Sequence, residues 1–424
     1  MTIELINTGS ELMLGRVLNT HQQWLCARLA DLGYVVNRQV AVPDTAIDIE
    51  QSVREGLSRA DLVITTGGLG PTCDDITRER IAGLLGLSLH RNASVEAQIH
   101  AYFISRGRPI PLRTQVEAMI PEGAIVLPNH HGTAPGIAIQ VSPNPFRHGG
   151  KPSWLVMLPG PPRELRPLFD LEVAPLIQRL FPSVDGFTCR TLKTTGLGES
   201  ALEELIAGPL KHLTDQGMDL GFCARVGEVD VRFVARGLQA DALVAEAESI
   251  TQRWVGPHIF GAQDDILESV LVHALAARGQ TLALAESCTG GHIANRITNI
   301  PGASAVLTAG FVTYANAAKI TALGVPESTL RDHGAVSEQT ARAMAEGARK
   351  AGSADWAISV TGIAGPSGAT LGKPVGTVFI GIASDHGTEV FHQINAFDRE
   401  TFKYLTAQQA LSRLLRRVQA GQTA

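Results

Sequence analysis

The first part of the chain alternates between short apolar runs and stretches in which apolar residues recur every three or four positions. These features follow one another as strand 2–7, helix 20–32, strand 34–42, helix 44–59 and strand 61–66. Asp44 is in place to cap the second helix. The order β-α-β-α-β is typical of a parallel sheet whose faces are covered by helices. Ligands of such sheets bind beyond the carboxyl ends of the strands, so the residues that follow each strand are the first candidates for a site.

A different pattern begins at about residue 181. Its predicted elements are strand 187–195, a helix opening at 199–206, hairpin strands 219–224 and 228–235, and helix 240–254. This order indicates a small α+β unit. The run at residues 196–199, Gly-Leu-Gly-Glu, follows a strand and ends in an acid, which is unlike the GxxG loop with which KH-type domains clamp RNA. We therefore expect this unit to act in packing or dimer formation.

The last part of the chain again alternates strands and helices. The predicted elements are helix 266–278, strand 281–284, strand 303–314, helix 337–350, strand 356–360, paired strands 375–383 and 389–394, and a last helix from about residue 397. A second α/β fold is expected from this order. The stretch 285–291, Ala-Glu-Ser-Cys-Thr-Gly-Gly, separates the first strand from a helical repeat at 292–297. It therefore lies on a strand-to-helix turn.

The composition narrows the class of protein. Of the 424 residues, 44% are hydrophobic and 18% are charged, which is typical of a globular chain with several domains. No apolar stretch has the length of a membrane span and the first residues lack the pattern of a signal peptide, so we expect a cytoplasmic protein without membrane contact. The net charge of -5 argues against nucleic acid as a partner. The five cysteines show no zinc-site spacing.

The third predicted strand ends in a turn that carries Gly67, Gly68 and Gly70. Glycines let a phosphate approach the backbone, and the helix that follows offers N–H donors at its start. Asp74 and Asp75 would repel that phosphate unless a divalent cation lay between them. The sequence therefore predicts a site for a phosphate and a Mg-like ion. The alternative is that the two aspartates only favour the helix dipole.

Ser287 lies on the strand-to-helix turn of the last domain. Backbone N–H groups at such a helix start, here those around Thr289, Gly290 and Gly291, can stabilise an anionic oxygen. A serine needs a base, and no His and acid pattern stands out, so Lys319 after the next apolar run is the candidate. A lysine in a poorly hydrated pocket has a lowered pKa and can accept a proton. The alternatives are a turn that only caps the helix and a lysine on the solvated surface.

The glycine-rich turn is one part of a longer constellation. The other parts are GSEL at 9–12, LPN at 127–129, GTAPG at 132–136 and LPGPPRE at 158–164. Together they resemble the molybdopterin-binding type of domain at the N-terminus of the CinA family, over about residues 1–178. The resemblance implies a parallel-sheet, MoaB/Mog-like fold and a metal-dependent pyrophosphatase activity on dinucleotides such as ADP-ribose.

The same resemblance extends the N-terminal site beyond the glycines and the two aspartates. It implies Glu11 as a further metal ligand, and Asn129 and Thr133 as residues that bind the substrate. One position departs from the family pattern, because His21 stands where the family usually has Asn after Asn-Thr. The contribution of this position to the pocket is therefore left open.

Four separated motifs in the last domain, AESCTGG, TYANAAK, TGIAGP and FDR, resemble the nicotinamide-nucleotide amidase domain of the CinA family. The implied reaction converts nicotinamide mononucleotide and water to nicotinic acid mononucleotide and ammonia, without a cofactor. The resemblance makes Ser287 the nucleophile and Lys319 its base, although a thiolate of Cys288 would be intrinsically more reactive. The other residues it implies are Tyr314, Ser304 and Thr361 in the polar network, Gly362 at the substrate, and Arg399 on either the substrate's phosphate or the active-site hydroxyls.

The three units are expected at residues 1–178, 179–258 and 264–424, and the middle one resembles the KH-like domain of full-length CinA proteins. The sequence thus predicts an α/β multidomain enzyme that acts on pyridine nucleotides and ADP-ribose and forms a homodimer. The alternative from another class is a competence-associated adaptor whose N-terminal domain binds a pterin or a nucleotide without hydrolysis. The acidic balance argues against an adaptor that binds DNA.

Overall fold

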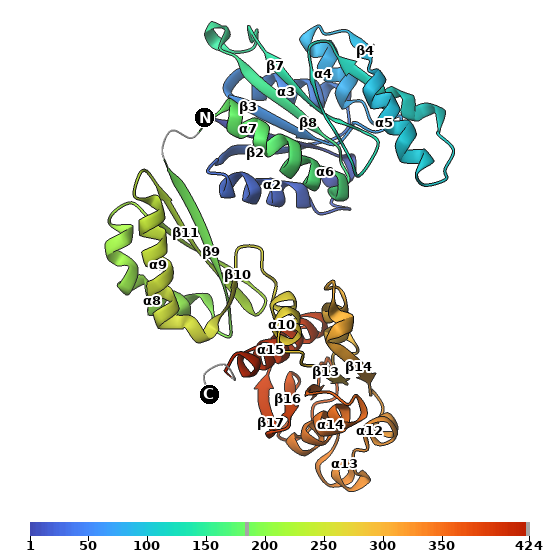
Figure 1. Cartoon of the computed structure of the whole chain (residues 1–424), viewed down its shortest axis with the longest axis vertical. Helices are drawn as coiled ribbons and strands as arrows, with labels where there is room; N and C mark the ends of the chain where they lie inside the picture. The colour runs from blue at the N-terminus through green and yellow to red at the C-terminus, as the bar shows by residue number, and fades with distance from the viewer. Residues whose placement is uncertain (183–185, 421–424) are drawn as a thin grey trace. The chain divides into compact units, whose positions relative to one another are not determined.

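The structure, a computed structural model, describes residues 1–182 and 186–420. Three larger sheets each form the centre of an α/β domain (Figure 1). The chain divides into two compact units, Met1–Cys189 and Arg190–Ala424, and the second unit holds both the middle and the C-terminal domain. Within the described residues, no helix combines the length and the apolar character needed to cross a membrane.

The N-terminal domain is built on a six-stranded sheet in the order β2-β1-β3-β8-β7-β6. Its strands are β1 (Ile3–Thr8), β2 (Val36–Val42), β3 (Leu62–Thr66), β6 (Ile125–Leu127), β7 (Gly136–Val141) and β8 (Ser153–Leu158). The first four in spatial order are parallel, and β7 and β6 add an antiparallel edge. β1 and β3 are buried along their whole length, as central parallel strands covered on both faces must be. The predicted parallel sheet is confirmed, with this edge added.

Helices cover both faces of the sheet (Figure 1). One face packs against α3 (Ala46–Arg59), α4 (Thr77–Leu85) and α5 (Ala93–Ile104), and the other against α2 (Thr20–Asp31), α6 (Pro162–Leu168) and α7 (Ala174–Leu180). The pleat of β3 sends Val63 to the first core and Ile64 to the second. Further short elements include α1 (Ser10–Met13), β4 (Leu89–Arg91) and β5 (Met119–Pro121).

The middle domain is a four-stranded sheet, in the order β10-β11-β9-β12, with two helices packed on one face. Its elements are β9 (Phe187–Thr195), α8 (Glu199–Thr214), β10 (Asp219–Arg225), β11 (Glu228–Arg236), α9 (Ala240–Val255) and β12 (Ile259–Ala262). Val229, Val231 and Phe233 alternate along β11 and share the core with both helices. The predicted hairpin forms between β10 and β11, which confirms the α+β unit.

The C-terminal domain has a five-stranded sheet in the order β14-β13-β15-β16-β17. Its strands are β13 (Leu282–Glu286), β14 (Leu307–Val312), β15 (Trp356–Gly362), β16 (Thr377–Ser384) and β17 (Gly387–Ile394). One face packs against α10 (Leu267–Ala276), α11 (His292–Thr298) and α15 (Arg399–Ala420), and the other against α12 (Asn316–Leu323), α13 (Glu327–His333) and α14 (Glu338–Ala351). Because β14, β13 and β15 are parallel, their carboxyl ends lie at one edge of the sheet.

Two local expectations are wrong. Asp44 does not cap α3, because Thr45 is the N-cap and the Asp44 carboxylate instead accepts the Ser10 N–H at 2.8 Å. The strand expected at 303–314 is shorter, since its first residues form the 3-10 turn Ala303–Ala305 and β14 begins only at residue 307. Both differences arise where a tight turn precedes the regular element.

Candidate active site

The carboxyl ends of three parallel strands bring the predicted amidase residues to one edge of the C-terminal sheet. Ser287 directly follows β13, and its N–H donates to the carbonyl of Val360 on β15 at 3.0 Å. On the other side of β13, the Thr313 N–H donates to the carbonyl of Glu286 at 2.8 Å. Residues that follow β14 and the end of β15, which carries Thr361, therefore flank Ser287.

Lys319, on the first half of α12, lies against this edge with 1% of its surface exposed. Its Nζ is 3.1 Å from Ser287 Oγ, 2.7 Å from the carbonyl oxygen of Thr313 and 3.3 Å from that of Tyr314. In the described part of the chain no carboxylate pairs with the amine, and burial lowers its pKa below 10.5. The surface alternative for this lysine is therefore excluded, and the contact with Ser287 is present.

The three contacts of Lys319 suit a neutral amine. An ammonium would donate to all three oxygen atoms, whereas a neutral amine, which has two N–H bonds and one lone pair, can donate to the two carbonyl oxygens and accept the Ser287 hydroxyl proton. Ser287 itself is 9% exposed, which leaves its oxygen at the border between the core and the solvent. The pair is thus arranged as a nucleophile and its base.

Cys288 points away from this chemistry into the core. Its thiol is 5% exposed and belongs to the same apolar cluster as Leu284 and Ile293. Burial, with the charge of Glu286 as a smaller cause, raises the pKa of the Cys288 thiol to about 12. A thiol that stays protonated at neutral pH is a poor nucleophile, so the structure favours Ser287.

Glu286, the last residue of β13, holds the turn that carries Ser287. Its buried carboxylate accepts the N–H groups of Gly291 at 3.0 Å, Ile293 at 3.1 Å and Ala294 at 2.8 Å. These are donors that the start of α11 would otherwise leave unpaired. Glu286 did not figure among the predicted site residues, although a glutamate that ends an otherwise apolar strand is a visible signal of this role.

The expectation of free N–H donors at Thr289, Gly290 and Gly291 is wrong for the two glycines. The Gly290 N–H donates to the carbonyl of Ser287 at 3.1 Å, and the Gly291 N–H to Glu286. The N–H groups of Thr289 and of the preceding cysteine donate to no backbone carbonyl in the described chain. Both N–H groups lie close to the Cys288 sulfur, where hydrogen bonds from them lower the pKa of the thiol.

The other predicted residues of this domain divide into two groups. Arg399 donates from Nη2 to the Tyr314 hydroxyl and from Nη1 to the Gly365 carbonyl, both at 2.8 Å. Two roles were expected for Arg399, a contact with the substrate's phosphate or one with the active-site hydroxyls. The structure shows a contact of the second kind. Thr361 is buried and donates to the Ala335 carbonyl at 2.7 Å. These contacts hold the rim of the site.

Ser304 and Gly362 have no visible part in the network. Ser304 is exposed on a turn before β14, and within the described chain no hydrogen bond joins its side chain to another residue, which contradicts its expected place. Gly362 lets β15 and β16 approach, because a Cβ there would lie 2.7 Å from the Thr377 carbonyl oxygen.

In the N-terminal domain a cavity of about 390 Å³ opens beyond the carboxyl ends of the parallel strands. Gly67 and Gly68, with φ of 96° and 67°, turn the chain into it, and Gly70 leaves room for a carboxylate, since a Cβ there would lie 2.6 Å from Asp75 Oδ2. Of the predicted residues, those that line the cavity are Glu11, His21, Gly67, Gly68, Asp74 and Asp75. Burial lowers the pKa of His21.

The acidic residues of this cavity do not form a preformed metal cage. Among the described residues, no group of three His, Cys, Asp or Glu side chains is placed to hold an ion, so the expected trio of Glu11, Asp74 and Asp75 is wrong as a complete ligand set. Asp75 Oδ2 is already taken by the Thr72 N–H at 2.9 Å. Mg²⁺, however, commonly binds through one or two carboxylates plus substrate phosphates. The donors present fit that arrangement.

Asn129 and Thr133 do not line the cavity, which contradicts their expected role at the substrate. The buried Asn129 amide donates to the Ala134 carbonyl and to Glu164 Oε2, each at 2.9 Å. Thr133 donates to Glu117 Oε1 at 3.2 Å, and burial raises the pKa of Glu117 to about 7. These residues form a buried network behind the glycine-rich turn that the sequence pattern did not reveal.

Three family models match successive parts of the chain. They are the probable molybdopterin binding domain over residues 4–179, the damage-inducible protein CinA KH domain over residues 189–261 and the CinA C-terminal domain over residues 264–418. A CinA-like protein of Akkermansia muciniphila is 43% identical over 414 residues, which are 97% of this chain and 96% of that protein. The chain belongs to the CinA family.

A second full-length relative agrees with this membership. A putative competence-damage inducible protein of Caldicellulosiruptor saccharolyticus is 41% identical over 416 residues, 97% of this chain and 98% of that protein. The crystal structure of the competence/damage inducible protein CihA from Agrobacterium tumefaciens is 42% identical, covering 35% of this chain and 92% of that chain, with a TM-score of 0.34. The two full-length matches span all three domains of this chain.

The role of Glu286 in the CinA C-terminal domain can be tested by thermal unfolding. In Glu286→Ala three N–H groups lose their buried acceptor, so we expect a loss of about 3 kcal/mol, or about 5–10 °C in the unfolding temperature of the domain. Glu338→Ala, on the exposed first turn of α14, is the control and should stay within about 0.5 kcal/mol. An unfolding temperature that Glu286→Ala left unchanged would contradict the role.

Proposed function

We propose that the C-terminal domain hydrolyses the carboxamide of nicotinamide mononucleotide to nicotinic acid mononucleotide and ammonia. The observation that carries the proposal is the distance of 3.1 Å between Lys319 Nζ and Ser287 Oγ, at a lysine that is almost wholly removed from water. A desolvated lysine beside a serine is a known variant of the serine nucleophile and its base. The substrate class comes from the resemblance of the four motifs to the nicotinamide-nucleotide amidase domain.

The first half of the reaction forms an acyl-enzyme. Neutral Lys319 accepts the hydroxyl proton while Ser287 Oγ bonds to the carboxamide carbon, and the carbonyl electron pair moves onto its oxygen. The N–H groups of Cys288 and Thr289 lie on the same turn as Ser287 and can donate to that oxygen. The Lys319 ammonium then gives its proton to the departing nitrogen, the C–N bond breaks, and ammonia leaves an ester on Ser287.

The second half restores the enzyme. A water molecule loses a proton to Lys319 and attacks the ester carbon, and the proton returns to Ser287 Oγ as the C–O bond breaks. The product is the carboxylate of nicotinic acid mononucleotide, together with one released proton. All proton transfers in this scheme use the same amine, so its protonation state governs both halves.

We further propose that the N-terminal domain hydrolyses the pyrophosphate of ADP-ribose-like dinucleotides with a divalent ion. The support is a cavity that joins the glycine turn at Gly67 and Gly68 to the carboxylates of Glu11, Asp74 and Asp75. An ion held by Asp74 and Glu11 would neutralise charge on the phosphates. The glycines keep side chains out of the way so that the phosphates can approach the backbone.

The choice of nucleophile is tested by single substitutions assayed with nicotinamide mononucleotide in excess chelator. Ser287→Ala should lower ammonia release by at least about a thousandfold, because no acyl-enzyme can form. Cys288→Ala should retain most of the activity, since the thiol is a protonated core residue. The reverse pattern would assign the nucleophile to Cys288.

The lowered pKa of Lys319 predicts the shape of the pH profile. The folded protein must release the Lys319 proton before the amine can act, so kcat/KM should rise tenfold per pH unit on the acid side and level off at a pH below 10.5. Lys319→Met should lose the activity, and any residual kcat/KM should not rise with pH on the acid side. A Lys319→Met enzyme with near-normal turnover and the same profile would remove the lysine from the mechanism.

The N-terminal proposal is tested with ADP-ribose. We expect chelation to stop the release of AMP, and Asp74→Asn to lower it at least about tenfold, while ammonia release from nicotinamide mononucleotide stays unchanged. Glu55→Gln, on the exposed face of α3, is the matched control. Hydrolysis that persisted in excess chelator would show that no metal held by Asp74 is needed.

A further inference from the structure

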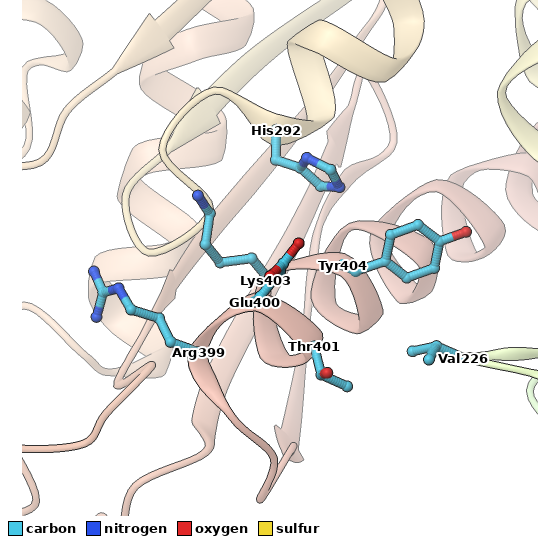
Figure 2. Close-up of a pocket in the computed structure, with 7 residues that line it drawn as sticks. All are labelled: Val226, His292, Arg399, Glu400, Thr401, Lys403 and Tyr404. Carbon is cyan, nitrogen blue, oxygen red and sulfur yellow. The ribbon is translucent and has the colours of Figure 1, made fainter. Parts of the chain in front are cut away.

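A second cavity, of about 780 Å³, lies in the second compact unit beside the turn that carries Ser287. Most of its lining comes from the first turns of α15, and the rest from the start of α11 and the tip of the β10–β11 hairpin (Figure 2). The lining residues are Val226, His292, Arg399, Glu400, Thr401, Lys403 and Tyr404. The mechanism proposed above uses none of them to form or break a bond.

The cavity has two cations on one side. Arg399 and Lys403 are four residues apart on α15, so their side chains project from the same face of the helix. Within the described chain neither forms an ion pair, and Arg399 is tied through Nη1 and Nη2 to neutral oxygen atoms. Glu400 is the one acid of the lining. In the described chain no carboxylate is therefore paired with either cation.

Lys403 reaches toward the nucleophile turn. A Cβ placed on Gly290 would lie 4.0 Å from Lys403 Nζ, and Figure 2 shows the Lys403 side chain extending toward the loop before His292. The Gly290 N–H in turn donates to the carbonyl of Ser287. A small substrate could thus place an anionic group at Lys403 while its reacting group lies at Ser287.

The opposite wall is aromatic and uncharged. His292 and Tyr404 have their ring centroids 6.0 Å apart in a tilted arrangement, and Val226 adds an apolar side chain. Burial lowers the pKa of His292, and the charges of Arg296 and Lys403 lower it further, so the imidazole is neutral at neutral pH. This wall suits a sugar or a flat ring and adds no charge of its own.

We infer that this cavity binds the phosphate group of the nucleotide substrate, with Lys403 as the principal contact. The inference rests on the amidase function proposed above and names a specificity residue for it. The start of α15 does not supply the donors, because Asp398 already accepts the N–H groups of Glu400 and Thr401 at 3.0 Å each. The phosphate is therefore held by side chains, and an ammonium group is a common phosphate ligand.

The test compares nicotinamide mononucleotide with nicotinamide riboside, which carries the same carboxamide and no phosphate. Lys403→Met should raise KM for the mononucleotide about tenfold with kcat within about twofold, because a ground-state contact is lost, and should leave riboside kinetics unchanged. Lys403→Arg should keep most of the preference for the mononucleotide. Lys350→Met, which removes an exposed lysine from the last turn of α14, is the control for loss of one positive charge.

Two kinetic outcomes would overturn the inference: equal losses on both substrates, which would mean that Lys403 only supports the turn, or no change on either. A wild-type protein that released no ammonia from the mononucleotide would defeat the amidase proposal instead. In that event calorimetry on Ser287→Ala decides the phosphate site separately. Tighter binding of the mononucleotide than of the riboside, with the difference lost in Lys403→Met, would support the site, and equal binding of both would overturn it.

Discussion

The burial of one amine is the condition on which the C-terminal site depends. Lys319 Nζ meets one hydroxyl and two carbonyl oxygens, and no carboxylate of the described residues pairs with it, so a positive charge there has no counter-ion. Each tenfold shift toward the neutral amine corresponds to about 1.4 kcal/mol of destabilisation of the ammonium form. The packing of α12 against the sheet edge thus penalises the charged state and in doing so makes the amine able to accept a proton.

Glu286 is also a buried ionisable group, but unlike Lys319 it is surrounded by backbone hydrogen-bond donors. Its carboxylate is as inaccessible as Lys319, but three backbone N–H groups of the next helix surround it. Because those donors pair with both of its oxygens, Glu286 does not need the lysine as a partner. The two groups lie on either side of the Ser287 turn without neutralising each other, and the negative charge also helps to keep the Cys288 thiol protonated.

The two candidate sites of the chain lie at the same place in their sheets but differ in the burial and charge of their key side chains. Both lie beyond the carboxyl ends of parallel strands, where loops can present side chains without breaking the sheet. In the N-terminal domain the carboxylate of Asp74 is exposed, and a hydrogen bond from Thr72 lowers its pKa, so it stays ionised and can attract a cation. In the C-terminal domain the decisive group is buried, and burial lowers the pKa of its amine.

The sequence by itself determined the order and type of the elements, because periods of two and of about 3.6 residues record which face of each element is buried. It also pointed to Ser287 and Lys319 from their chemistry.

The sequence did not decide that Asn129 and Ser304 lie outside the sites, since membership of a motif does not encode which cavity a side chain faces. The sequence did not point to Lys403 for a related reason. Its spacing from Arg399 is visible in the sequence, but the cavity between α15 and the Ser287 turn is not. Only the tertiary structure could bring together a serine and a lysine that are 32 positions apart, because the contact requires β14 to pair in parallel beside β13 and α12 to pack its lysine under the end of that strand.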